Sequence, residues 1–119
     1  MKKLYLTKSR YIDGLRCEKK LWLGWHERLG YEEALPYSIL DFGNRVGRGA
    51  WALFPGGVEV TEKPYEHDAA VATTASLMAR DAPAIFEAAF EFENIRIRVD
   101  VLERLEDGWG LREVKSNKE

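Results

Sequence analysis

The last third of the chain alternates apolar and charged residues with a period of two, which is the pattern of a β-strand. One face of residues 95–104 carries Ile95, Ile97, Val99 and Val101, and the other carries Arg96, Arg98, Asp100 and Leu102. The Asp-Gly pair at 107–108 predicts a hairpin loop, followed by a strand over 109–115. Residues 85–92 form an earlier apolar run. Together these features predict an antiparallel three-stranded meander.

Helical periodicity dominates the residues before this meander. The expected elements are a helix that begins at Thr7 or Ser9, helices over 17–28, 38–54 and 68–80, and a short strand at 58–60. The order of helices first and strands last is typical of an α+β fold. The third helix contains Gly43, Gly47 and Gly49, which weaken a helix and therefore predict close packing or a close approach to the backbone.

The length and composition fit a single domain over residues 1–119. Hydrophobic residues make up 45% of the 119 residues, which is enough to form a core. No apolar run is long enough to span a bilayer, so we expect no membrane partner. The single cysteine, Cys17, excludes an internal disulfide, and we expect a cytoplasmic protein in which this residue is a buried free thiol.

Charge is distributed unevenly along the chain, although the net charge is only −2. Residues 1–30 carry a balance of +5 and residues 31–94 a balance of −7. The basic segment predicts phosphate contacts beside an acidic, cation-binding region. The candidate nucleic-acid contacts are Lys8, Arg10, Arg16, Lys19 and Lys20. Solvated helix faces are the alternative explanation, and charge alone favours it.

Two carboxylates are expected to lie side by side across the last hairpin. A loop closed near residues 105–108 pairs Leu102 roughly with Leu111, which brings Asp100 close to Glu113 on the next strand. Glu113 and Lys115 are two residues apart, so both side chains would point to the same face. Neighbouring carboxylates repel each other unless a cation lies between them. The pattern therefore predicts a metal site.

Mg²⁺ or Mn²⁺ is the expected ion, because hard divalent cations prefer oxygen ligands. Asp100 and Glu113 would bind it, with the Val114 carbonyl as a third ligand. The Lys115 ammonium would then activate a water molecule and stabilise charge on a scissile phosphate. Alone, a Glu-x-Lys pair on a strand is more often a surface salt bridge, so the preceding Asp100 is what favours a catalytic site.

Several segments in the same order resemble RecB-type PD-(D/E)xK nucleases, in particular a bacterial branch related to the CRISPR-adaptation exonucleases. These segments are 6–11, 17–23, 42–47, 53–58, 87–90, 97–102 and 108–116. The resemblance covers nearly the whole chain. It implies a restriction-endonuclease-like core and a metal-dependent nuclease that hydrolyses phosphodiester bonds of DNA, in DNA repair or phage defence.

The resemblance also implies a role for four side chains. Asp100 and Glu113 match the metal ligands and Lys115 matches the catalytic lysine. Glu87 matches an acid that precedes the first core strand. It would be either a further ligand, directly or through water, or a residue of a helix-to-strand junction on the surface, and the two roles are about equally supported.

The chain departs from the family pattern in three places. Gly47 stands where many relatives have a histidine, which removes one potential ligand. Relatives continue past the lysine, whereas this sequence stops at Glu119, so we expect the core to lack its C-terminal part. Cys17 matches the first cysteine of an iron–sulfur cluster found in some relatives, but no partner cysteines exist and such a cluster is not expected. An alternative is therefore a catalytically incomplete module that binds nucleic acid or a protein partner.

Overall fold

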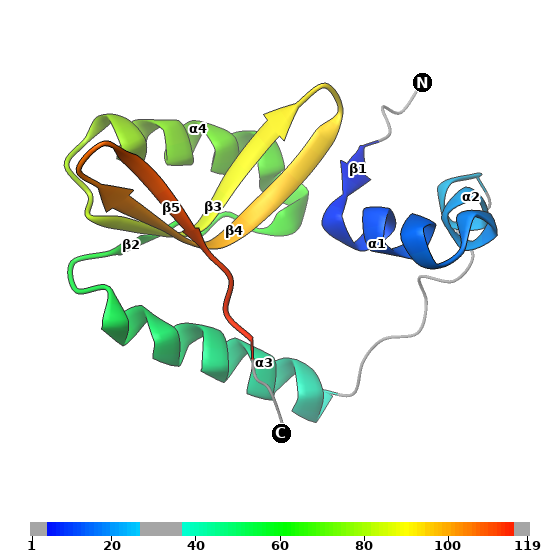
Figure 1. The fold of residues 1–119 in the computed structure, drawn as a ribbon, viewed down its shortest axis with the longest axis horizontal. Coiled ribbons are helices and arrows are strands. Elements are labelled where there is room, and N and C mark those ends of the chain that lie inside the picture. The colour runs from blue at the N-terminus through cyan, green and yellow to red at the C-terminus, as the bar shows by residue number, and fades with distance from the viewer. Residues whose placement is uncertain (1–4, 27–36, 116–119) are drawn as a thin grey trace. The chain divides into compact units, whose positions relative to one another are not determined.

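A computed structural model describes residues 5–26 and 37–115 and confirms the α+β class (Figure 1). The described part contains four α-helices and a mixed sheet of five strands. The elements are β1 (Leu6–Thr7), α1 (Lys8–Arg16), α2 (Glu18–His26), α3 (Tyr37–Ala50), η1 (Trp51–Leu53), β2 (Val58–Glu59), η2 (Pro64–Glu66), α4 (His67–Ala79), β3 (Ala84–Phe92), β4 (Ile95–Leu105) and β5 (Gly108–Arg112). No helix among them is long and apolar enough to cross a membrane.

The chain divides into two compact units, the first formed by residues 1–36 with 91–97. In this unit, β1 pairs in parallel with the first residues of β4. The Thr7 side chain accepts a hydrogen bond from the Arg10 N–H (3.3 Å) and caps α1, so Thr7 rather than Ser9 begins this helix. The expected second helix is observed as α2, and its last two expected residues, 27 and 28, lie outside the described residues.

The second unit comprises residues 37–90 and 98–119 and contains most of the sheet. β2 pairs with β3 in parallel and β4 pairs with β5 in antiparallel fashion, with Leu102 opposite Leu111 as expected. The parallel pairs make the sheet mixed, so an antiparallel meander alone does not describe it.

The last strand is shorter than the sequence pattern predicted. β5 ends at Arg112, and residues 113–115 follow it without regular structure. The Val114 N–H donates to the Asp100 carboxylate (2.8 Å) instead of to a backbone carbonyl of β4, so this side chain replaces the next ladder bond. The prediction that the strand continues to residue 115 is therefore wrong, although the Glu113 and Lys115 side chains do lie together, as an ion pair of 3.3 Å.

Two apolar clusters hold the second unit together, and Figure 1 shows α4 and α3 on opposite sides of its strands. The first cluster joins α4 to β3 and β4 through residues that include Ala70, Leu77, Ile85 and Leu102. The second joins Ala84, Phe86 and Val101 to Trp51 and Phe54 after α3. Val99 packs against the first cluster and Val101 belongs to the second, so the expected alternation is broken between these two residues.

A glycine allows the second cluster to pack tightly. The Trp51 and Phe86 rings stack with centroids 4.6 Å apart. A Cβ atom on Gly57 would collide with the Phe86 ring, so only glycine lets the backbone lie against that ring. This packing positions the C-terminal end of α3 beside β3.

Candidate functional site

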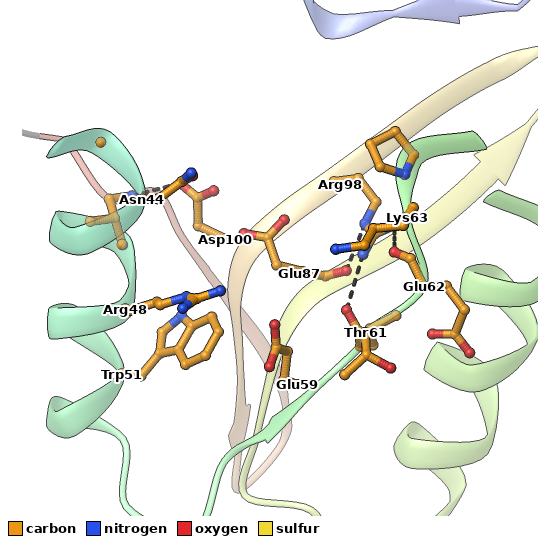
Figure 2. A pocket seen from close by; sticks show the side chains of 15 residues that line it. Asn44, Arg48, Trp51, Glu59, Thr61, Glu62, Lys63, Glu87, Arg98 and Asp100 are labelled. Atoms are coloured by element: carbon orange, nitrogen blue, oxygen red, sulfur yellow. Dashed lines mark hydrogen bonds between the residues drawn. The ribbon is translucent and has the colours of Figure 1, made fainter. Parts of the chain in front are cut away.

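A pocket of about 500 Å³ lies within the second unit (Figure 2). Its walls are α3, the segment that follows β2, the middle of β3 and β4, and Val114. Figure 2 shows acidic side chains from the strands facing Arg48 of α3. The acids Glu59, Glu87 and Asp100 come from β2, β3 and β4, respectively. Three strands therefore contribute one carboxylate each to a single concave surface.

Glu87 has an unusual backbone conformation in the middle of β3. Its φ is 61°, in the left-handed region that side-chain-bearing residues rarely adopt. The inward and outward alternation of β3 stops at this point, since Ala88 and Ala89 are both fully buried and both belong to the first cluster. A β-bulge has this effect, and it re-aims a side chain. The Glu87 carboxylate consequently points into the pocket.

The surroundings of Glu87 disfavour its charged form. Partial burial raises the pKa of its carboxyl group above the usual value, and repulsion from Asp100 and Glu59 raises it further. Arg98 opposes this shift but does not cancel it. Carboxyl groups whose pKa is perturbed by burial and by neighbouring charges are common in functional sites.

Asp100 connects the pocket to the segment that follows β5. Its Oδ2 accepts the Val114 N–H at 2.8 Å, and both residues line the pocket. The Glu-x-Lys segment predicted from the sequence therefore contacts Asp100 through its central residue.

The outer two residues of that segment are on the surface. The Lys115 Nζ lies 3.3 Å from the Glu113 Oε1, and the side chains are 66% and 49% exposed. Neither residue lines the pocket. The structure thus brings together Asp100, Glu87 and Val114 from the predicted metal set, and does not bring Glu113 or Lys115 into the pocket.

Arg98, which sequence analysis placed only by its strand face, is held by three backbone carbonyl groups. Its guanidinium donates to the carbonyls of Glu87 (2.8 Å), Glu62 (3.1 Å) and Val60 (3.2 Å). It thereby joins the irregular point of β3 to the segment after β2. The one signal in the sequence was the position of Arg98 two residues before Asp100, which places both on one face of β4.

Glu59 and Glu62 are further acids of the pocket that sequence analysis did not single out. The Thr73 hydroxyl donates to the Glu62 Oε1 (2.5 Å), and this hydrogen bond lowers the pKa of the carboxyl group. The hydrogen bond from Thr73 of α4 thus favours the ionised form of Glu62. The alternation of the short strand at residues 58–60 was the only sequence signal for the direction of Glu59.

The glycines of α3 were expected to allow close packing or a close approach to the backbone. Gly43 and Gly47 line the pocket, and a Cβ atom at either position would have no neighbour within 4 Å. Close packing within the described residues therefore does not explain them, and their effect is to leave open space on the α3 wall between the side chains of Asn44 and Arg48.

The basic residues proposed as nucleic-acid contacts lie in the first unit and differ in their surroundings. Arg10 donates to the Tyr5 carbonyl (2.8 Å) and lies 5.4 Å over the Trp25 ring, while Lys20 pairs with Asp13 at 3.3 Å. Lys8, Arg16 and Lys19 are exposed on α1 and α2. Cys17, expected to be buried, is an exposed free thiol at the end of α1, because it ends the helix rather than packing against its apolar face.

The donor set of the pocket is compatible with a hard cation, although it is incomplete as a cage. Among residues 5–26 and 37–115, no three His, Cys, Asp or Glu side chains are arranged to hold a metal ion. Mg²⁺ commonly uses one or two carboxylates and completes its shell with water and substrate phosphate. Asp100 and Glu87 meet that requirement, and their mutual repulsion favours a cation between them.

Comparison of the chain with protein-family models, curated proteins and solved structures gives no match.

Proposed function

We propose that this chain is a Mg²⁺- or Mn²⁺-dependent nuclease of the PD-(D/E)xK type that hydrolyses phosphodiester bonds of DNA. The observation that carries the proposal is the hydrogen bond from the Val114 N–H to the Asp100 carboxylate (2.8 Å). It joins the two parts of the sequence motif at the wall of an acidic pocket. The DNA substrate and a cytoplasmic location follow from the sequence resemblance and the cysteine usage.

In this proposal, Asp100 and Glu87 bind the metal ion and the Val114 N–H orients the Asp100 carboxylate. A bound divalent ion supplies Lewis-acid polarisation of the scissile phosphate and a more acidic water. Arg48 on the opposite wall is exposed to solvent and would attract the phosphate. Lys115 would stabilise negative charge in the transition state after a rotation that breaks its pair with Glu113.

A nucleic-acid-binding module without turnover is the second candidate. It is favoured by the exposed Glu113–Lys115 pair, because an ammonium that is paired outside the pocket is not positioned to act on a phosphate bound there. In that case Asp100 and Glu87 would still form the acidic pocket, and no divalent cation would support DNA cleavage.

The test is a cleavage assay of the full chain on single- and double-stranded DNA with Mg²⁺ or Mn²⁺. We expect cleavage that a chelator abolishes and that falls by at least about 100-fold in Asp100→Asn. Asp107→Asn is the matched control, since Asp107 is exposed in the neighbouring hairpin loop and should tolerate the change. Equal rates for wild type and Asp100→Asn would refute the nuclease assignment, and metal binding without cleavage would select the second candidate.

A further inference from the structure

Arg98 and Arg104 are two similar arginines on the same strand, and only one of them reaches the pocket. Arg104 also donates to three backbone carbonyls, those of Ala82 (2.9 Å), Met78 (2.9 Å) and Arg80. None of these residues lines the pocket. Arg98 differs because one of its three acceptors is the carbonyl of Glu87, whose side chain faces Asp100.

Arg98 donates a hydrogen bond to the carbonyl of Glu87, the residue of β3 with the least favourable backbone conformation. A glutamate with a φ of 61° remains in that conformation only if the surrounding structure holds it there. The Arg98 Nε holds the Glu87 carbonyl at 2.8 Å, and the other two donors of the same planar group bind Val60 and Glu62. Because a guanidinium is rigid, these three bonds fix the Glu87 peptide relative to the segment after β2.

We propose that Arg98 is a positioning residue, which holds the backbone of Glu87 in its left-handed conformation and so directs this carboxylate beside Asp100 for divalent cation binding. The metal-binding part of this inference rests on the proposed function. Arg98 itself does not touch the ion. Its guanidinium donates to three carbonyl groups, so it acts on the pocket through the backbone of Glu87, in addition to its electrostatic attraction for the Glu87 carboxylate.

The experiment compares the full-length wild-type chain with Arg98→Met, Arg98→Lys and the matched control Arg104→Met. The first readout is the pair of Cα and Cβ chemical shifts of Glu87, which distinguish left-handed from extended backbone without any metal. We expect these shifts to move toward extended values in both Arg98 variants and to stay unchanged in Arg104→Met. Lysine should not rescue the conformation, since an ammonium cannot donate to three carbonyls in one plane.

The second readout is Mn²⁺ affinity by calorimetry. We expect a loss of about 10- to 100-fold in the Arg98 variants, the usual range when a residue that orients a metal ligand is removed. Arg104→Met should bind Mn²⁺ as the wild type does. If Arg98 had a purely structural role, Arg98→Met and Arg104→Met would lose stability alike and the chemical shifts of Glu87 would stay unchanged.

Each outcome decides one question. Unchanged Glu87 shifts in Arg98→Met, full rescue by lysine, or equal losses of affinity in Arg98→Met and Arg104→Met would overturn the positioning role. If the wild-type chain binds no Mn²⁺, the proposed function fails. The chemical shifts would then still show whether Arg98 holds the backbone of Glu87.

Discussion

Replacement of Glu87 should stabilise the protein, which is the opposite of what removal of a well-placed strand residue does. A left-handed conformation costs a side-chain-bearing residue about 1–2 kcal/mol. Glycine removes that cost, although its greater freedom in the unfolded chain offsets about 0.5–1 kcal/mol. Glu87→Gly also removes a half-buried charge that Asp100 and Glu59 repel. We therefore expect a gain of about 1 kcal/mol at neutral pH, or about 4 °C in Tm for a domain of this size.

The charge contribution can be separated by pH with Glu87→Gln, which keeps the backbone conformation. The pKa of Glu87 is raised in the folded state, so the folded chain holds the proton more tightly than the unfolded chain. The ionised Glu87 carboxylate therefore destabilises the folded chain. This loss of stability is absent below the unfolded-state pKa of 4.5 and grows as pH rises from there through the folded-state pKa. The free energy of unfolding of Glu87→Gln should therefore equal that of the wild type at pH 4 or lower and exceed it at pH 7.

The assay is thermal and urea unfolding of the full chain at both pH values. Glu93→Gly is the control for the backbone contribution, because Glu93 has a φ of 45° but lies exposed in the turn between β3 and β4. It should gain stability without any effect on the pocket. The reasoning is refuted if Glu87→Gln is less stable than the wild type at pH 7, or if Glu87→Gly is no more stable than Glu87→Ala.

Three further predictions concern other parts of the chain. Lys115→Ala should leave Mn²⁺ affinity intact and lower cleavage by about 10²–10³-fold, measured as metal-dependent turnover, and equal rates would exclude Lys115 from the mechanism. DNA binding should weaken as salt rises, and Arg16→Ala or Lys19→Ala should reduce the slope of log affinity against log salt by about one each; an unchanged slope would exclude phosphate contacts there. Thr74→Val should destabilise the chain by about 1–3 kcal/mol in urea unfolding, because the buried Thr74 hydroxyl accepts from the Ala89 N–H (2.9 Å), and a neutral change would contradict that bond.

Local patterns predicted the regular parts of the fold well. The helix start at Thr7 depends on a side chain three residues from its partner, and the pairing of Leu102 with Leu111 depends on a short hairpin loop. Both are interactions between residues close in sequence, which periodicity and turn chemistry describe. The parallel additions of β1 and β2 depend on partners far away in the sequence: Leu6 pairs with Ile95, 89 residues on, and Val58 with Ile85, 27 residues on. No local pattern specifies these pairings.

The candidate site was predictable only in part, for the same reason. Asp100 and Val114 were singled out together, and they do meet. The left-handed backbone of Glu87 could not be predicted, because the three carbonyl contacts of Arg98 support it and two of these come from the segment after β2. The early end of β5 was missed because the Asp100 side chain, and not a backbone carbonyl, accepts the Val114 N–H, and no local pattern indicates such a replacement.

The most direct test of the central claim is a calorimetric titration of Mn²⁺ into the full chain and two variants. If the acidic pocket is a cation site, the wild type binds Mn²⁺, Asp100→Asn does not, and Glu103→Gln, on the same strand but outside the pocket, binds as the wild type does. Absence of binding by the wild type, or equal binding by Asp100→Asn, would contradict the account.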